Sequence, residues 1–203
     1  MIETLKRLDL DLFFWINGHH SPFFDRLEWW MTQTWFWIPL FIVVLFLMIR
    51  HYRGKIWGIL LCLAFCVFLT DQGSVLIKKQ VRRPRPTHAV EIRDQVHVHR
   101  YSNGNEYRGG PYGFPSSHAA NGFGLTVLLI AFVKPITRHA WWIFPLWVLL
   151  SCYTRVYLGV HYPSDICCGA LLGMACGFFV LGLYRAGCSL RIIKTNKTNI
   201  IKS

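Results

Sequence analysis

The stretch WWMTQTWFWIPLFIVVLFLMI, residues 29–49, contains no charged side chain. A helix needs about 20 largely apolar residues to cross roughly 30 Å of hydrocarbon, so this stretch predicts a membrane-spanning helix. In the apolar stretch over residues 166–184, Gly169, Gly173 and Gly177 recur at four-residue spacing, which lets a neighbouring helix approach closely. The apolar stretch over residues 140–154 would be only about 22 Å long as a helix, so we expect this helix to continue past Arg155. The sequence thus predicts an all-α, polytopic membrane helical bundle with about five transmembrane helices, over residues 29–49, 56–77, 114–133, 140–154 and 166–184.

The composition also indicates a membrane protein. Of the 203 residues, 53% are hydrophobic and 16% are charged, whereas a soluble domain carries about 25% charged residues. The nine Trp and fifteen Phe exclude a disordered chain. Lys and Arg outnumber Asp and Glu by 22 to 10, which here indicates loops that meet anionic headgroups rather than a nucleic-acid partner. The seven cysteines include no CxxC pair and are interpreted as small hydrophobic residues.

We expect one integral-membrane domain over residues 1–203, with three parts outside the spans. Residues 1–28 mix acids, bases and aromatics, which favours helices lying in the membrane interface over a sixth span. Residues 78–113 form one long connection, and residues 185–203 form a basic tail. Basic residues divide almost evenly between the two sides, but many lie in the long connection, where they can serve a site. When the basic residues of the long connection are left out of the count, the remaining ones predict a multi-pass protein of the cell (inner) membrane. Its tail is then cytoplasmic, and its long loop lies on the outer, periplasmic side.

The long connection begins with a cluster of cations, KKQVRRPRP, at residues 78–86. A basic run alone is typical of a surface that binds lipid headgroups. Here two prolines restrict the backbone on either side of Arg85, so its guanidinium is directed rather than free. Asp71 lies within a span, two helical turns before Lys78, and an ionisable residue in a span indicates function. We expect Asp71 to pair with Lys78 or with a nearby arginine and hold it in position.

A second cluster, FPSSHAAN at residues 114–121, marks the start of a helix with serine at its cap. A helix start offers free backbone N–H groups and the positive end of the helix dipole, which together favour an anion. Ser116 and Ser117 add hydroxyl donors, and His118 in the first turn is placed to give a proton to a leaving group. An ordinary serine cap with an incidental interfacial histidine is the alternative interpretation.

A third cluster, TRVYLGVHYPSD, occupies residues 154–165. Arg155 ends an apolar span, where a guanidinium is costly unless it meets an anion. His161 and Asp165 are four residues apart across a turn, so the carboxylate can fix the imidazole tautomer and leave the other ring nitrogen as a base or nucleophile. All three clusters lie at span ends on one side of the membrane. Two histidines and three directed cations in one place indicate phosphoryl transfer through a histidine nucleophile.

The three clusters resemble the motifs of the type 2 phosphatidic acid phosphatase superfamily, the membrane lipid phosphate phosphatases related to vanadium haloperoxidases. Its motifs Lys-x6-Arg-Pro, Pro-Ser-Gly-His and Ser-Arg-x5-His-x3-Asp correspond in order to the stretches that begin at Lys78, Pro115 and Thr154. Ser117 replaces the motif glycine, and it can still offer its backbone N–H if its φ is negative. Thr154 replaces the motif serine and keeps the hydroxyl. Neither departure removes a charged group, so we expect an active enzyme.

The resemblance implies a set of roles and neither a metal nor another cofactor. His161 would attack phosphorus, oriented by Asp165. His118 would protonate the leaving oxygen, and the phosphohistidine would then be hydrolysed. The groups implied to bind the phosphate belong to Lys78, Arg85, Ser116, Ser117 and Arg155.

The expected substrate is a lipid phosphate or diphosphate whose chains stay in the bilayer. Undecaprenyl diphosphate is the first expectation, because Lys79, Arg82 and Arg83 offer spare cations and because a bacterial source is assumed. Phosphatidic acid, phosphatidylglycerol phosphate and lipid A are the alternatives. A catalytically silent lipid-binding or transport module is a competing class, although it would require a disabled set of catalytic residues. A metal site at His97 and His99, beside a predicted short hairpin, would need further ligands that the spacing does not supply.

Overall fold

The computed structural model describes the backbone of residues 2–200 and the side chains of residues 3–189. This part of the chain contains helices and no β-strand, as the sequence predicts. The helices are α1 (Ile2–Gly18), α2 (Pro22–Met31), α3 (Thr34–Tyr52), α4 (Ile56–Val81), α5 (Ser117–Val133), α6 (Ala140–Tyr157) and α7 (Pro163–Ile200), with short 3₁₀ turns η1 (Arg53–Lys55), η2 (Pro86–His88) and η3 (Arg93–Gln95).

Each of the five predicted spans has a helix in its place. α3 begins at Thr34, because Trp29 belongs to the preceding helix α2. α6 continues past Arg155, as its length requires. Two segments are apolar and long enough to cross a membrane by length and composition, Thr34–Val81, which joins α3 to α4, and Pro163–Ser189, whereas the apolar helix α5 is shorter. The number of helices that cross the bilayer therefore stays a prediction.

The two ends of the chain are also helical. α1 and α2 occupy the region expected to hold interfacial helices. The predicted tail, residues 185–203, begins as a continuation of α7, and its side chains beyond residue 189 lie outside the described residues.

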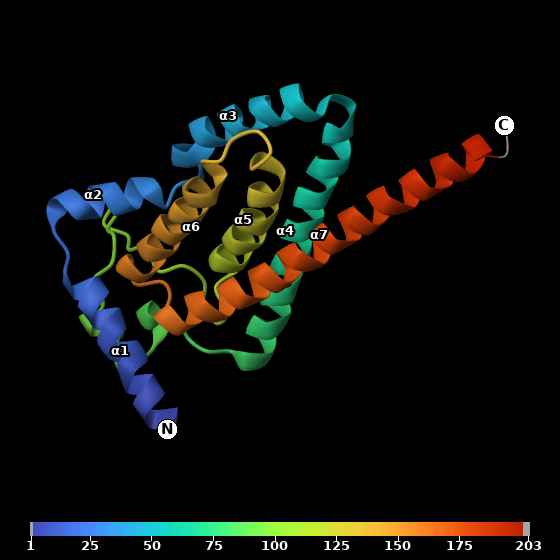
Figure 1. Ribbon diagram of the computed structural model, residues 1–203. Coiled ribbons are helices and arrows are strands. Elements are labelled where there is room, and N and C mark those ends of the chain that lie inside the picture. The colour runs from blue at the N-terminus through green and yellow to red at the C-terminus, as the bar shows by residue number, and fades with distance from the viewer. Residues whose placement is uncertain (1, 201–203) are drawn as a thin grey trace.

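α5 is the centre of the bundle and packs against α4, α6 and α7, while α1 and α2 lie against α6 (Figure 1). The core between these helices is apolar and includes the fully buried Ile59 and Leu128. α7 crosses α5 where its glycines recur. A methyl group added at Gly169 would overlap the carbonyl oxygen of Ser116, the N-cap of α5, and one added at Gly173 would overlap that of Ala120 in α5. The predicted packing role of these glycines is therefore confirmed.

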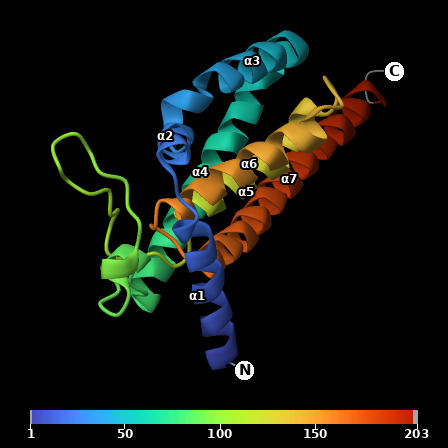
Figure 2. The same cartoon turned by 90° about the vertical axis from the view of Figure 1, so that its left-hand side faces the viewer.

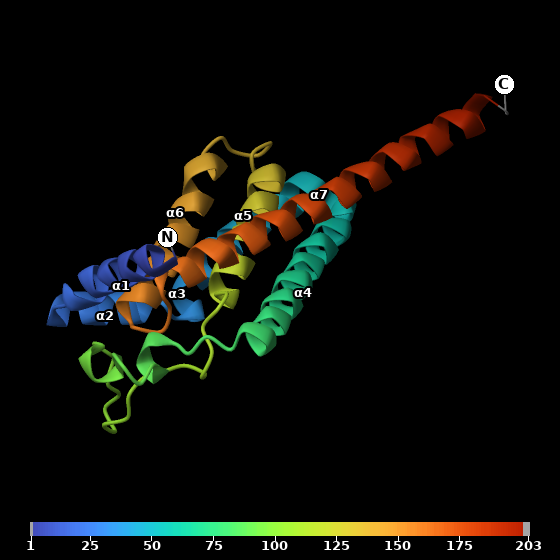
Figure 3. The same cartoon turned by 90° about the horizontal axis from the view of Figure 1, so that it is seen from below.

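The long loop, residues 82–116, leaves the bundle at the end of α4 and returns at the start of α5 (Figures 2 and 3). It begins later than predicted, because α4 continues to Val81. Its tip is the expected short hairpin, closed by a bridge between Arg100 and Glu106. Asn17 of α1 fixes the loop to the bundle, since its Nδ2 donates to the carbonyl oxygens of His97 at 2.8 Å and Tyr157 at 2.7 Å. The loop is thus held beside the ends of α1 and α6.

Candidate active site

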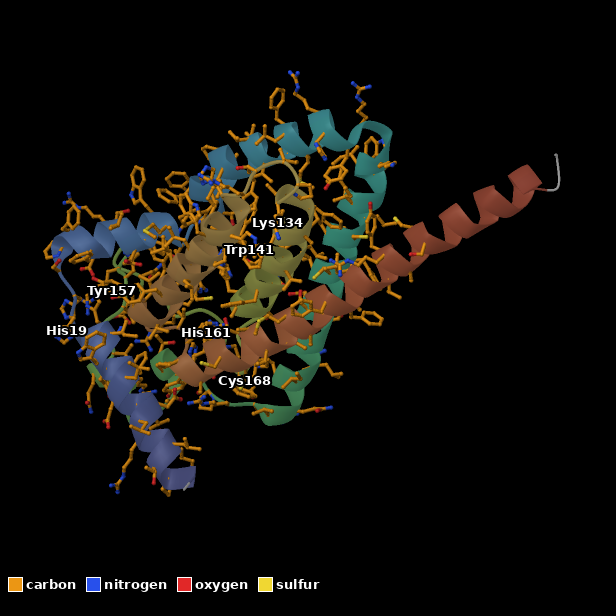
Figure 4. The ribbon with its side chains drawn as sticks, viewed as in Figure 1. His19, Lys134, Trp141, Tyr157, His161 and Cys168 are labelled. Atoms are coloured by element: carbon orange, nitrogen blue, oxygen red, sulfur yellow. The ribbon has the colours of Figure 1, made fainter. Side chains whose placement is uncertain are left out.

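The three sequence clusters meet at one end of the bundle. Figure 4 shows His161 at this end, close to the start of α7, and Lys134, which follows α5, at the opposite end. Four helices of the bundle supply site residues from a terminal turn: Lys78 from α4, Ser117 and His118 from α5, Arg155 from α6 and Asp165 from α7.

His161 and Asp165 form the buried pair that their spacing predicts. His161 Nδ1 lies 3.4 Å from Asp165 Oδ2, and the two residues are 2% and 0% exposed. The same oxygen accepts a hydrogen bond at 3.0 Å from the backbone N–H of Tyr162, which fixes the carboxylate. With Nδ1 facing Asp165, the ring presents Nε2 as its free nitrogen. Burial, followed by the charges of Arg85 and Arg155, holds the pKa of His161 well below its usual range, so the ring is neutral at neutral pH.

Arg85 contacts the free nitrogen of the histidine directly. Its Nη1 lies 3.3 Å from His161 Nε2 and donates to the carbonyl oxygen of Val160 at 3.2 Å. Gly109 leaves room for the guanidinium, because its φ is +67° and a Cβ there would lie 2.8 Å from Arg85 Nη1. The directed guanidinium that the two prolines predict is confirmed. An anion beside Nε2 therefore meets the Arg85 side chain.

Arg155 is 8% exposed and only partly satisfied. Its Nη1 donates to Thr32 Oγ1, at the end of α2, at 2.8 Å, and its guanidinium lies 5.8 Å from the ring centre of Tyr107 in the long loop. Its Nε is buried without a hydrogen-bond partner in the described part of the chain. Leaving a charged donor buried and unpaired is costly, so this guanidinium is suited to binding an anion.

Ser117 connects α4 to the start of α5. Its Oγ accepts a hydrogen bond from Lys78 Nζ and lies 2.7 Å from Ser74 Oγ. Ser117 is not among the residues with positive φ, so the replacement of the motif glycine causes no backbone strain. The hydroxyl group of the serine side chain binds Lys78 and holds it at the site.

Ser116 and His118 have different environments. Ser116 is fully buried and caps α5, because its Oγ accepts from the N–H of Ala119 at 3.3 Å. Its own N–H donates to the carbonyl oxygen of Asp165 at 2.9 Å, which joins the starts of α5 and α7. The His118 side chain is exposed and makes no hydrogen bond within residues 3–189. It lies in the first turn of α5, next to Ser117, at the end of the bundle that carries Lys78 and Arg155.

Two expectations about charged partners are wrong. Among the described side chains Asp71 forms no ion pair, because Lys78 bonds the serine hydroxyl at the start of α5 instead. Arg83, expected to be a spare cation for a diphosphate, is engaged in ion pairs with Asp9 and Asp165.

Three side chains away from this site offer ligand atoms within 4.8 Å of one another, those of His20, Asp25 and His97. His97 Nε2 already lies 2.9 Å from Asp25 Oδ1. The rings of His20 and His97 are stacked, with centroids 3.7 Å apart and planes 4° from parallel. Lone pairs of stacked rings lie in parallel planes and do not converge on a metal ion about 2.0–2.1 Å away. We interpret this cluster as a contact that joins α2 to the long loop.

A pocket of about 690 Å³ lies between α2 and the long loop. Its wall includes Thr87, which follows Arg85 by two residues, and none of the site residues described above. Four of its lining residues are arginines: Arg26, Arg93, Arg100 and Arg108. Three acids, Asp25, Asp94 and Glu106, line the same pocket, and Arg93, Arg100 and Arg108 form ion pairs with the last two of them.

Known proteins are similar to this chain in sequence and in fold. The PAP2 superfamily matches residues 55–187, which include all three clusters. The chain is 36% identical over 181 residues to a lipid A 4'-phosphatase of Bacteroides thetaiotaomicron, covering 85% of this chain and 75% of that protein. It is 30% identical over 191 residues to a lipid A 4'-phosphatase of Porphyromonas gingivalis, covering 90% of this chain and 75% of that protein.

Two crystal structures have the same fold. The structure of Aquifex aeolicus LpxE superposes with a TM-score of 0.66 at 26% identity, covering 86% of this chain and 95% of that chain. A transmembrane PAP2-type phosphatidylglycerolphosphate phosphatase of Bacillus subtilis gives a TM-score of 0.64 at 22% identity, covering 90% and 87%. The resemblance seen in the motifs is confirmed, and the chain belongs to the PAP2 superfamily as a membrane lipid phosphatase.

Proposed function

We propose that this protein hydrolyses a phosphate monoester of lipid A through a phosphohistidine on His161. The observation that carries the reaction is the placement of the His161 imidazole, whose Nε2 lies 3.3 Å from Arg85 Nη1 while its Nδ1 faces Asp165. The substrate is supported by the two lipid A 4'-phosphatases that align with most of this chain. They favour lipid A, and its 4'-phosphate, over undecaprenyl diphosphate, the first expectation from the sequence.

The proposed reaction has two steps. Arg85, Arg155 and Lys78 bind the phosphate oxygens and stabilise the charge of the pentacoordinate transition state. His161 Nε2 attacks phosphorus, the ester bond breaks, and His118 gives a proton to the leaving sugar oxygen. His118 then takes a proton from a water molecule that attacks the phosphohistidine, which releases inorganic phosphate and restores His161. Each group of this scheme belongs to the chain, and we propose that the reaction needs no metal.

The place of the site in the fold supports a lipid substrate. The reacting groups lie at the ends of apolar helices, where a lipid phosphate meets the protein with its acyl chains still in hydrocarbon. We propose that this end of the bundle faces the periplasm in a multi-pass inner-membrane protein.

Phosphate release by the detergent-purified protein tests the function. Four substrates are compared in excess EDTA, namely lipid A, phosphatidic acid, undecaprenyl diphosphate and p-nitrophenyl phosphate. We expect lipid A to be hydrolysed fastest, with inhibition by vanadate, which mimics the transition state. Faster turnover of undecaprenyl diphosphate than of lipid A would contradict the substrate, and activity that requires an added divalent ion would contradict the mechanism.

A further inference from the structure

We propose that Arg83 and Asp9 form a charged link that positions the catalytic pair His161 and Asp165, so that helix α1 is part of the active site. This inference rests on the proposed function, because the link acts on the nucleophile of that reaction. Arg83 and Asp9 are positioning residues, since neither contacts the reacting nitrogen.

Arg83 contacts three polar side chains and one aromatic ring of the protein. Its Nη1 donates to Asp165 Oδ1 at 2.9 Å and to Ser164 Oγ at 2.6 Å, and its Nη2 donates to Asp9 Oδ2 at 2.7 Å. Its guanidinium also lies 4.0 Å from the ring centre of Tyr162. Both terminal nitrogens are therefore occupied, and a substrate phosphate would have to break these ion pairs to reach them.

Asp9 fastens the start of α7 to α1. Its Oδ1 accepts from the backbone N–H of Ser164 at 2.8 Å, and its Oδ2 lies 2.5 Å from Ser164 Oγ. This N–H belongs to the first turn of α7, where backbone donors have no partner within the helix. The Asp9 side chain is 10% exposed, and its contacts with Ser164 are partly buried. An acid from α1 thus caps the helix that carries Asp165.

The link determines how the Asp165 carboxylate is oriented. Oδ1 is bound by Arg83, while Oδ2 accepts from Tyr162 N–H and faces His161 Nδ1. Because Asp165 is fully buried, its charge needs a compensating cation, and Arg83 is its ion-pair partner. Without Arg83 the carboxylate is free to rotate or take up a proton, and His161 then loses the partner that selects its tautomer.

Steady-state kinetics of three variants test the link. Arg83→Gln should lower kcat by about 10- to 100-fold, a loss like that seen when the outer partner of a metal-binding histidine is removed, with KM changed less than about threefold. Asp9→Asn should lower kcat by a smaller factor. The double variant should be no slower than Arg83→Gln, because both residues act through one link. Arg83→Lys should recover only part of the activity, since lysine lacks the fork that reaches both acids.

Arg7→Gln is the matched control. It removes the same charge from an exposed side chain of α1, two residues before Asp9. Its kcat should equal that of the wild type. Size-exclusion profiles and melting temperatures establish that each variant is folded. If Arg83→Gln does not fold, the Asp9→Asn variant tests the link by itself. An unchanged kcat in that variant would overturn the link.

Two further kinetic results would overturn the link. A rise in KM with unchanged kcat for Arg83→Gln would make Arg83 a substrate-binding residue and overturn the link. Independent, multiplicative losses in the double variant would also overturn it. The assays use both lipid A and phosphatidic acid, and the fractional losses should agree, because the link acts on His161 and not on the lipid. If the wild type hydrolyses only phosphatidic acid, the lipid A proposal fails while the link is still tested.

Discussion

Proton donation to the leaving oxygen is the task that the proposed mechanism gives to His118. A sugar or glycerol alkoxide needs that proton more than a leaving phosphate does. His118→Gln should therefore slow hydrolysis of phosphatidic acid by about 10²- to 10⁴-fold and slow hydrolysis of diacylglycerol diphosphate much less. The two lipids differ only in the leaving group, and phosphate release from both is measured for the wild type and the variant. Equal fractional losses would argue against an acid role for His118.

The residues that touch the proposed phosphate site were partly predictable from spacing. Lys78, Arg85 and Arg155 each sit in a motif, and charge in or beside an apolar span marks them without a structure. Thr32 could not be found in this way, because it lies 123 residues from Arg155 and a threonine at a helix end has many ordinary roles. The engagement of Arg83 was missed for the same reason, since its partner Asp9 lies 74 residues away.

At the scale of elements, the contact between α5 and α7 depends on the absence of side chains. A Cβ at Gly173 would overlap the Ala120 carbonyl oxygen, whereas a Cβ at Gly182 on the same helix has no neighbour within 4 Å. Gly173→Ala should destabilise the protein by about 1–3 kcal/mol through overpacking. Gly182→Ala should leave stability unchanged or raise it by up to about 1 kcal/mol, because alanine favours the helix. Melting in detergent measures both, and equal melting temperatures would contradict the packing described.

Helix α2 carries a buried acid, Glu28, which is 5% exposed and has an Oε2 without a hydrogen-bond partner among the described residues. Burial raises the pKa of Glu28 from 4.5 to about 7. Between these two pH values the folded protein holds a proton that the unfolded chain has lost, so stability falls as the pH rises from about 4.5 to about 7.

Glu28→Gln removes this titration. Relative to the wild type, the variant should be stabilised at pH 8 by up to about 3 kcal/mol more than at pH 4.5. Melting temperatures of both proteins across this range measure the difference. A constant difference between the two proteins at all pH values would show that Glu28 ionises in the fold as it does in water.

The positions of the helices followed from hydropathy, but their ends did not. Trp29 and Met31 are apolar and were included in the first span, yet they complete α2, because the chain turns after Met31 and α3 starts at Thr34. Similarly, α4 continues through Lys78 to Val81, which places Lys78 on a helix instead of in the loop. Apolar character alone does not record where a helix begins or ends.

For the whole molecule, the sidedness of the site is the first matter to test. In a variant whose seven native cysteines are replaced, a cysteine at Asn103 in the hairpin and one at Gly54 in the turn between α3 and α4 report on opposite ends of the bundle. We expect an impermeant thiol reagent added to intact cells or spheroplasts to label Asn103→Cys and not Gly54→Cys. The reverse pattern would place the site in the cytoplasm and exclude an outer-leaflet substrate.

Identification of the phosphorylated residue tests the central claim most directly. The purified protein is mixed with lipid A carrying ³²P in its phosphates, quenched in alkali, and mapped by peptide sequencing. The mechanism predicts an acid-labile, base-stable label on the peptide that contains His161, with neither label nor phosphate release in His161→Ala. Wild-type phosphate release by His161→Ala, or a base-labile label on another residue, would contradict it.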